Sequence, residues 1–260
     1  MGTHVKLVHA ILQKAMPEVR GIDLKYLDVG AQELYGGDAS EYAAFFAWAR
    51  REGAVDAGLR DRCYDLARRS EHRWNPITDG APRTTVGELF GILGWQYQSI
   101  DVLGGTLALD LNYAALDPAL LGRFDVVANF GTTEHVFNQL ACFRLIHDAT
   151  RVGGVMIHFL PTSGYFYHCL FKYDPKMFVL LREANGYEVL HAGFGGREGH
   201  SQIGEGHESW ANYPDMHAEV IPNRLIKFVF RKTKRHPFQV PYDKDTKPGY
   251  RISEDYQPLA

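Results

Sequence analysis

The sequence has few cysteines and no long hydrophobic run. Its three cysteines, Cys63, Cys142 and Cys169, are odd in number and widely separated, which argues against a disulfide framework and favours a reducing compartment. No stretch reaches the roughly 18 consecutive apolar residues of a transmembrane helix. Residues 5–16 alternate apolar with polar positions, so they lack the apolar core of a signal peptide. We therefore expect a cytoplasmic protein without membrane insertion, beginning with an amphipathic helix.

An excess of positive charge is also missing. The 260 residues include 28 Lys and Arg against 31 Asp and Glu, giving a formal net charge of −3 and a pI near 6.5. Such a chain has no overall positive field to hold a polyanion by its phosphates, so we expect no nucleic-acid partner. Hydrophobic residues make up 45% and charged residues 23%, which predicts a folded globular chain. The length suits a single domain over residues 1–260.

Short apolar segments alternate with segments of helical periodicity. This alternation predicts a parallel sheet covered by helices on both faces, which is a doubly wound α/β fold. Thr84 or Thr85, followed by Glu88, predicts a capped helix start. Helices are predicted at 5–16, 86–93, 138–150 and 178–184. Seven strands are predicted, at 25–30, 97–102, 106–111, 124–129, 155–160, 188–192 and 225–231.

Three segments fall outside this alternation. Helical spacing of aromatic and aliphatic residues over about 38–72 predicts an inserted pair of helices after the first strand. Their aromatic residues are expected to pack on the main core, with a lid over the ligand as the alternative. Residues at about 193–222 are rich in Gly and His without periodicity, which predicts a long loop able to cover a site. The polar, proline-containing tail at 233–260 is expected to pack as irregular chain over the surface.

The first predicted strand ends in an acidic residue and a glycine. Asp28, Val29 and Gly30 close the apolar run and are followed by Ala31 and Gln32. A glycine in this place lets the backbone approach a ligand closely. The turn lacks the Gly-x-Gly-x-x-Gly pattern that seats a pyrophosphate, which disfavours a nicotinamide oxidoreductase. A strand ending in Asp-x-Gly is also a common structural turn, so both interpretations stay open.

Two further carboxylates follow predicted strands. Asp101 precedes Val102 at the end of one strand, and Asp110 precedes Leu111 at the end of the next. A carboxylate can accept hydrogen bonds from both hydroxyls of a vicinal diol, which makes Asp101 a candidate ligand-binding group. Each carboxylate also has a structural interpretation, as a solvent-facing strand end for Asp101 and as an Asx turn for Asp110.

A longer pattern begins with the strand predicted at 124–129. Arg123-Phe124-Asp125-Val126-Val127 leads through Asn129 and Gly131 to Glu134-His135-Val136, and then to Arg151-Val152-Gly153-Gly154. Over roughly residues 25–232, the order and spacing of these segments resemble the class I S-adenosylmethionine-dependent methyltransferase family. Residues 28–36 and 164–187 resemble a branch of that family often found beside surface-polysaccharide genes.

The resemblance implies a fold, a cofactor and an acceptor. The fold would be a doubly wound, mostly parallel, seven-stranded Rossmann-like sheet, and the cofactor would be S-adenosyl-L-methionine. Asp101 would accept both ribose hydroxyls, Asp110 would meet the adenine amine, and Leu111 or Asn112 would flank the ring. The implied cofactor-binding residues are Asp28, Gly30, Ala31, Gln32, Asp101, Val102, Asp110, Leu111, Asn129 and Gly131. The acceptor would be a small molecule or a saccharide, methylated on a hydroxyl.

The Glu134-His135 pair is the candidate for the catalytic chemistry. Methyl transfer to a hydroxyl needs in-line alignment and a base, and an ordinary histidine can take a proton at neutral pH. We therefore predict His135 as the base, with Glu134 beside it. Glu134, His135 and His168 also resemble the divalent-metal cluster of plant small-RNA 2′-O-methyltransferases, although Gly131 stands where that family has another Glu. A metal with open sites, a histidine that only holds the loop, and a non-catalytic binding protein remain alternatives.

Overall fold

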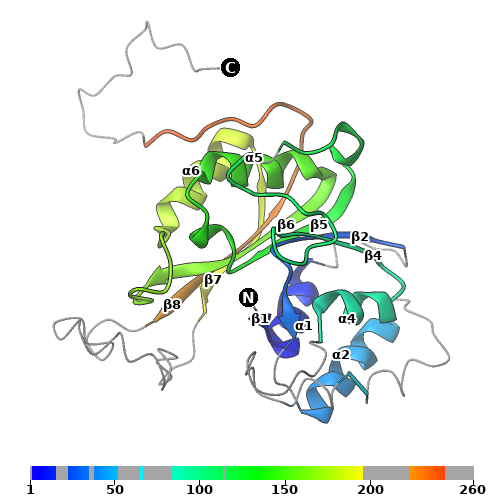
Figure 1. The fold of residues 1–260 in the computed structure, drawn as a ribbon. Coiled ribbons are helices and arrows are strands. Elements are labelled where there is room, and N and C mark those ends of the chain that lie inside the picture. Colours follow the sequence, from blue (N-terminus) through cyan, green and yellow to red (C-terminus); the bar gives the residue numbers. More distant parts are fainter. Residues whose placement is uncertain are drawn as a thin grey trace, which may run out of the picture.

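The computed structural model describes residues 2–15, 23–34, 38–51, 65–66, 84–113, 115–195 and 223–243. Within these ranges a six-stranded sheet has the order β4-β2-β5-β6-β8-β7, and helices cover both of its faces (Figure 1). The pairs between β4, β2, β5 and β6 are parallel, whereas β8 is antiparallel to both β6 and β7. The mostly parallel, doubly wound α/β sheet is confirmed, but the described part of the chain has six strands in it and not seven.

The elements have the following bounds. The strands of the main sheet are β2 (Lys25–Val29), β4 (Gln96–Ile100), β5 (Phe124–Phe130), β6 (Thr150–Ser163), β7 (Glu188–Gly195) and β8 (Arg224–Arg231). A small parallel sheet pairs β1 (Gly2–Thr3) with β3 (Glu33–Leu34). The helices are α1 (Val5–Ala15), α2 (Ala39–Arg51), α4 (Val86–Ile92), α5 (Gln139–Ala149) and α6 (Pro175–Asn185), and the 3₁₀ turns are η1 (Pro118–Leu120) and η2 (Thr133–His135). No helix in the described ranges is long and apolar enough to span a membrane.

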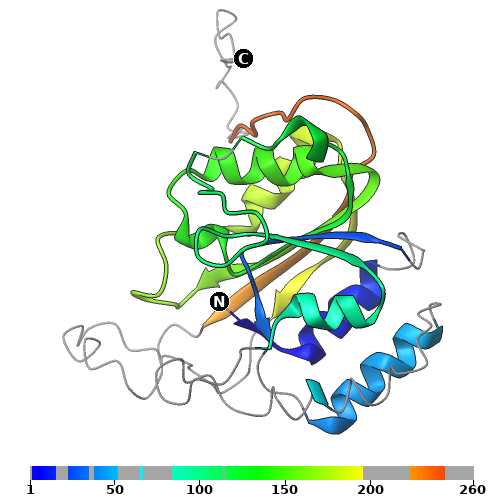
Figure 2. The same ribbon diagram turned by 45° about the vertical axis from the view of Figure 1, so that its right-hand side comes forward.

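Apolar side chains of the central strands alternate between two cores, because helices cover both faces. Tyr26 of β2 joins the core formed with α1, α2 and α4, whereas Leu27 and Val29 join the core formed with α5 and α6. Figure 2 shows these two helical layers on either side of the sheet. A strand buried on both faces has few polar positions, which is why β2 could be predicted as a short apolar run.

The strand predicted at 106–111 does not form. This segment makes only an isolated bridge between Leu107 and Ile100. Beside it, the Thr106 hydroxyl accepts a hydrogen bond from Ser99 N at 2.8 Å and donates to Ser99 O at 3.2 Å. A side chain that bonds to the backbone competes with a strand ladder. The Thr106 hydroxyl therefore satisfies part of the edge of β4 where a seventh strand was expected.

Two predicted strand ends are too early. β6 continues past residue 160, where the predicted strand ended, because β8 pairs with it in the antiparallel direction as far as Ser163. β7 also pairs with β8 and extends to Gly195, so the loop predicted from about residue 193 begins later. Residues 196–222 of that loop lie outside the described ranges.

The first part of the predicted helical insertion corresponds to α2. Tyr42, Phe45 and Trp48 of α2 are buried in the same core as Val5 and Val8 of α1. These contacts support the packing interpretation of the aromatic residues rather than the lid. The rest of the insertion lies outside the described residues, apart from residues 65 and 66.

The C-terminal segment at 233–243 is irregular and binds to α5 and α6. The Asn185 side chain pairs with the backbone of Gln239, donating to its carbonyl at 2.9 Å and accepting from its N–H at 2.8 Å. The ring of buried His147 lies 2.6 Å from the Tyr187 hydroxyl and 2.8 Å from His236 O. These bonds lie among α5, α6 and the tail. Residues 244–260 are outside the described ranges.

The order of the strands defines one end of the sheet as the place for a ligand. From β2 the chain passes to β4 on one side and then to β5 on the other. In open α/β sheets, ligands bind outside the carboxyl ends of the strands where the order reverses in this way. The segments that follow β2, β4 and β5 meet at this end, and they carry most of the predicted site residues.

Candidate active site

The turn after β2 interlocks with the turn after β5 through Gly30 and Thr132. Gly30 has φ +92° and donates from its N–H to Ile100 O at 2.8 Å. A Cβ at Gly30 would collide with Thr132 Oγ1, the atom to which Gln32 Nε2 donates at 3.2 Å. Glycine is therefore required here for its backbone conformation and for the close approach of the second turn.

We expect Gly30→Ala to reduce stability. The alanine would adopt an unfavourable positive φ and would displace Thr132, and a strained position of this kind costs about 1–3 kcal/mol. Gly91→Ala is the matched control, because Gly91 lies in α4 with no atom within 4 Å of its added Cβ. Alanine inside a helix is favoured over glycine by about 0.5–1 kcal/mol. Urea unfolding measures both variants, and equal free energies of unfolding would contradict this role of Gly30.

Asp101 joins the turns that follow β2 and β4. Its Oδ2 accepts from Ala31 N at 3.1 Å and its Oδ1 accepts from Leu103 N at 2.9 Å. The side chain is partly exposed, and Val102 beside it is 59% exposed. Each carboxylate oxygen can accept a further hydrogen bond. The structure thus brings together the predicted residues Gly30, Ala31 and Asp101, with acceptor capacity left on Asp101.

Asp28 lies deeper than the sequence suggested. Its side chain is fully buried, and its Oδ2 accepts from the Tyr97 hydroxyl at 3.2 Å. Burial raises the pKa of Asp28 well above its usual value. Tyr97 in turn stacks on Phe90 of α4, so this hydrogen bond of Asp28 lies in the interior beside α4, and its buried Oδ1 has no hydrogen-bond partner among the described residues.

The segment around Asp110 has the structural form that the sequence left open. Asp110 is exposed, and its Oδ1 accepts from both the N–H and the side-chain amide of Asn112, at 2.8 and 3.0 Å. This is an Asx turn. Leu111 is buried in the core, so it packs beneath this turn. Asn112 in turn accepts from Asn138 N at 3.1 Å, which fixes the segment to the start of α5.

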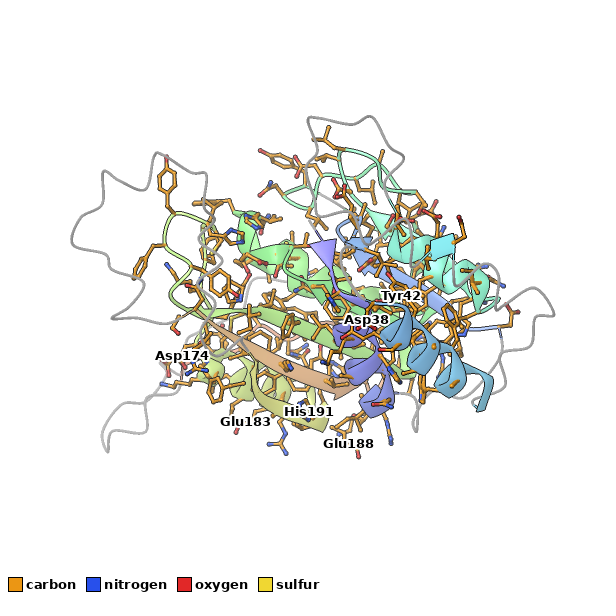
Figure 3. The ribbon with its side chains drawn as sticks, turned by 90° about the horizontal axis from the view of Figure 1, so that it is seen from below. Asp38, Tyr42, Asp174, Glu183, Glu188 and His191 are labelled. Carbon is orange, nitrogen blue, oxygen red and sulfur yellow. The ribbon has the colours of Figure 1, made fainter. Side chains whose placement is uncertain are left out.

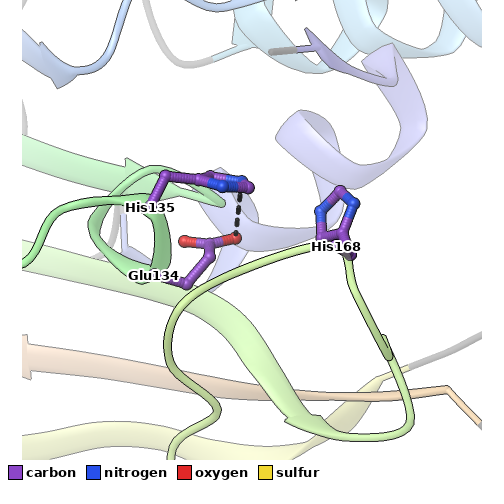
Figure 4. Close-up of side chains that lie close together, drawn as sticks. All are labelled: Glu134, His135 and His168. Atoms are coloured by element: carbon purple, nitrogen blue, oxygen red, sulfur yellow. Dashed lines mark ion pairs between the residues drawn. The ribbon is translucent and has the colours of Figure 1, made fainter.

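Glu134, His135 and His168 lie together, as predicted (Figure 4). Glu134 and His135 belong to η2 after β5, and His168 belongs to the segment after β6. One ligand atom from each residue lies within 4.8 Å of the other two, and Glu134 Oε1 is 4.0 Å from His135 Nε2. The backbone carbonyl of Glu134 accepts from the N–H groups of Leu170 and Phe171. These two hydrogen bonds hold the His168 segment against η2.

Glu134 is buried, whereas His135 and His168 at the same cluster are exposed, and partial desolvation disfavours the charged form of each of the three side chains. The Glu134 side chain is 3% exposed, and burial raises its pKa to about 8. Burial and the neighbouring His168 lower the pKa of His135 to about 4, and burial also lowers the pKa of His168. Glu134 Oε2 is buried without a hydrogen-bond partner in the described part of the chain. A buried polar atom left unpaired is costly, so this oxygen is a candidate contact for a ligand.

Beneath the cluster lies a network that includes three residues the sequence analysis missed. The predicted residue Asn129 is fully buried and donates from its side chain to Thr133 Oγ1 at 2.9 Å, and Tyr173 and Gln139 continue the network from there. Gly131 has φ +69°, and a Cβ there would lie 3.2 Å from Glu134 Oε1. Asn129 and Gly131 therefore shape the turn that carries Glu134. The resemblance over 164–187 includes Tyr173 without giving it a role, and the roles of Tyr173 and Gln139 come from bonds that join segments distant in sequence.

Comparisons with known proteins give only weak similarities. No protein-family model matches the sequence, and no curated protein is significantly similar to it. The 1,6-didemethyltoxoflavin-N1-methyltransferase of Burkholderia thailandensis is 14% identical with a TM-score of 0.42, over 88% of this chain and 77% of that chain. An S-adenosylmethionine-dependent methyltransferase of Mesorhizobium loti is 14% identical with a TM-score of 0.36, over 85% of this chain and 96% of that chain. Similarities of this strength do not identify a family or an activity for this chain.

Proposed function

We propose that this chain is an S-adenosylmethionine-dependent methyltransferase with a small-molecule acceptor. The observation that carries the proposal is the arrangement at the switch point of the sheet. There the Gly30 turn and Asp101 are joined by the bond from Ala31 N, and Glu134, His135 and His168 cluster after β5 and β6. A cofactor site and a reacting site on neighbouring strands are what methyl transfer requires, because acceptor, methyl and sulfur must lie in line.

The residues after β2 and β4 fit the cofactor that the sequence resemblance implies. Asp101 is partly exposed and has lone pairs available for the two hydroxyls of a ribose. Gly30 has no side chain, and Thr132 packs where its Cβ would lie, so the turn that would meet the cofactor keeps its shape. Asp110 has its Oδ1 engaged in its Asx turn, so Oδ2 is the oxygen that would meet the adenine amine. S-adenosyl-L-methionine would supply the methyl group, and these residues would hold it.

We infer that the acceptor atom is a hydroxyl, and that a saccharide is the acceptor class implied by the polysaccharide-associated branch. Glu134, His135 and His168 are the groups available to take or stabilise the hydroxyl proton. A base works best when its pKa is near the operating pH. With its pKa lowered to about 4, His135 alone is a weak base. This disfavours the simplest role for His135, although the residue remains in the proposed site.

The cluster fits a divalent metal better than it fits a lone base. Glu134, His135 and His168 provide one carboxylate and two neutral imidazoles, a ligand set that suits metals such as zinc and leaves open positions. The buried Glu134 Oε2, which has no partner among the described residues, would gain one. A metal held here would lower the pKa of a bound hydroxyl. Neutral histidines are ready to coordinate, whereas Glu134 would lose its proton on binding.

Binding of S-adenosylhomocysteine tests the cofactor site. We expect Asp101→Ala to weaken its affinity about tenfold or more, because each charge-assisted hydrogen bond contributes roughly 1.5–3 kcal/mol. Asp117→Ala is the control, since Asp117 is also an exposed carboxylate that accepts from a backbone N–H, here at the start of η1. Titration calorimetry measures both variants. Unchanged affinity in Asp101→Ala would remove Asp101 from the site, and binding without methyl transfer to any hydroxyl would favour a non-catalytic binding protein.

A further inference from the structure

Tyr173 is the centre of a closed ring of hydrogen bonds around η2. Its hydroxyl lies 3.0 Å from Thr133 Oγ1 and 2.7 Å from Gln139 Oε1. Gln139 Nε2 returns to the backbone of the turn, donating to Thr133 O at 2.7 Å and to Val136 O at 2.5 Å. Because Gln139 Oε1 can only accept, the phenol proton goes to Gln139 and the Thr133 hydroxyl donates to the phenol oxygen. Every member of the ring then has a partner.

The ring is continuous with the ends of both neighbouring strands. Asn129 at the end of β5 donates to Thr133 Oγ1 at 2.9 Å and accepts from Thr133 N at 3.3 Å. Tyr173 N donates to Pro161 O of β6 at 2.8 Å. Tyr173 is only 3% exposed, and burial raises the pKa of its phenol, so the hydroxyl keeps its proton at physiological pH. The ring therefore fixes the backbone on both sides of Glu134 and His135.

Tyr173 also ends the segment that carries His168. Four residues separate His168 from Tyr173, along a stretch that is bound to the Glu134 carbonyl through Leu170 N and Phe171 N, at 2.9 and 3.1 Å. A single side chain thus connects the turn that carries Glu134 and His135 with the segment that carries His168. A connection of this kind is needed wherever three groups from two separate segments must keep a fixed spacing.

We propose that Tyr173 is a positioning residue that sets the spacing of Glu134, His135 and His168. It does so through its hydrogen bonds to Thr133 and Gln139, without touching the reacting atoms. The inference rests on the proposed function in one respect, since it takes these three residues as the reacting side of the site. Loss of the phenol oxygen would leave Thr133 and Gln139 without a shared partner, so the His168 segment would stay attached to η2 through the backbone bonds to Glu134 O but with a less fixed spacing.

The test compares Tyr173→Phe with Tyr187→Phe in the full chain. Both tyrosines are nearly fully buried, at 3% and 4% exposure. The Tyr173 hydroxyl bonds to buried Thr133 at 3.0 Å and to partly buried Gln139 at 2.7 Å, whereas the Tyr187 hydroxyl lies 2.6 Å from the ring of buried His147. Tyr187 packs against His147 of α5 and Phe230 of β8, outside the cluster. Each variant should lose stability to a similar degree. Thr133→Val, which removes a hydroxyl from the same ring, is the second variant.

Two measurements separate positioning from stability. The first is calorimetric titration with Mn²⁺ alone, where we expect Tyr173→Phe and Thr133→Val to weaken affinity about 10–100-fold, as loss of a residue that orients metal ligands does. The second is the rate at which diethyl pyrocarbonate modifies His135 and His168, followed by peptide mass spectrometry, which we expect to rise several-fold in both variants. Tyr187→Phe should change neither.

The rate at which diethyl pyrocarbonate modifies His135 and His168 tests the positioning role of Tyr173 even if the wild-type chain binds no Mn²⁺. If Tyr173→Phe and Thr133→Val match Tyr187→Phe in both measurements, Tyr173 has only a structural role and the proposal is overturned. Failure of the proposed function has a different signature, namely a wild-type chain that does not bind S-adenosylhomocysteine. The two failures are therefore distinguishable.

Discussion

Replacing His135 with alanine is expected to lower kcat for methyl transfer by about 10²–10⁴-fold, the range that removing a proton from the acceptor contributes. Replacing His168 should cost as much, because the cluster fits a divalent metal better than a lone base and each histidine would be a ligand. Both rings lie beside Glu134, with their centroids 5.1 Å apart, so neither can be removed without opening the same cluster. The affinity for S-adenosylhomocysteine should stay unchanged, because Asp101 and the Gly30 turn follow different strands. A radiolabelled methyl-transfer assay with saccharide acceptors measures the first quantity, and calorimetry measures the second.

Treatment with a chelator distinguishes a metal role from a base role, and a histidine variant far from the cluster serves as the control. If the cluster holds a metal, EDTA should abolish turnover, a divalent ion should restore it, and His168→Ala should be as damaging as His135→Ala. If His135 acts as a base, chelator should have no effect and His135→Ala alone should be severe. His191→Ala is the control, since His191 lies on β7 at the edge of the sheet opposite β4 (Figure 3). Near-normal turnover in both cluster variants would contradict any catalytic role for these histidines.

Replacing Glu134 with glutamine is expected to stabilise the fold at pH 8 while abolishing activity. Burial raises the pKa of Glu134 to about 8 from an ordinary value of 4.5, so the folded chain holds a proton that the unfolded chain releases. Stability therefore falls as pH rises from about 4.5 to about 8. Glutamine has the same shape and no charge to bury, and the gain at pH 8 should be about 2–5 kcal/mol.

Urea unfolding at pH 5 and pH 8 measures this effect. The difference between Glu134→Gln and the wild-type chain should be small at pH 5 and large at pH 8, because pH 5 lies near the lower end and pH 8 at the upper end of the range over which the unfolded chain releases a proton that the folded chain retains. Glu183→Gln on α6 is the matched control, since Glu183 is exposed and should give no pH-dependent difference (Figure 3). A difference for Glu134→Gln that is equal at the two pH values would show that burial of the carboxyl does not destabilise the fold.

Local signals in the sequence predicted the elements that position the site. The start of α4 was predicted from Thr85 and Glu88, and the structure has the complete capping box between them. The run that became β2 was predicted because burial on both faces leaves a short apolar pattern. The absence of the seventh strand could not be predicted in this way, because residues 106–111 have the alternating pattern of a strand. In the structure the Thr106 side chain bonds to the backbone of Ser99, where backbone hydrogen bonds of a strand were expected.

In the candidate site, too, the part carried by a local motif could be predicted, and the part that depends on contacts between distant segments could not. The grouping of Glu134, His135 and His168 was predicted from a motif, and the structure brings the three together. Its supporting network was not predicted, since Tyr173 and Gln139 are 34 residues apart and meet only when β6 lies beside β5. The surroundings of His135 also contradict the expectation that this residue has the pKa of an ordinary histidine. The sequence suggested His135 as an ordinary base, whereas its surroundings lower its pKa to about 4.

A crystal structure of the chain with S-adenosylhomocysteine tests the central claim most directly. The account predicts the ribose hydroxyls on the Asp101 carboxylate, the amino-acid end of the ligand against the Gly30 turn, and the sulfur facing Glu134, His135 and His168. A ligand bound elsewhere, or one whose sulfur points away from this cluster, would contradict the account.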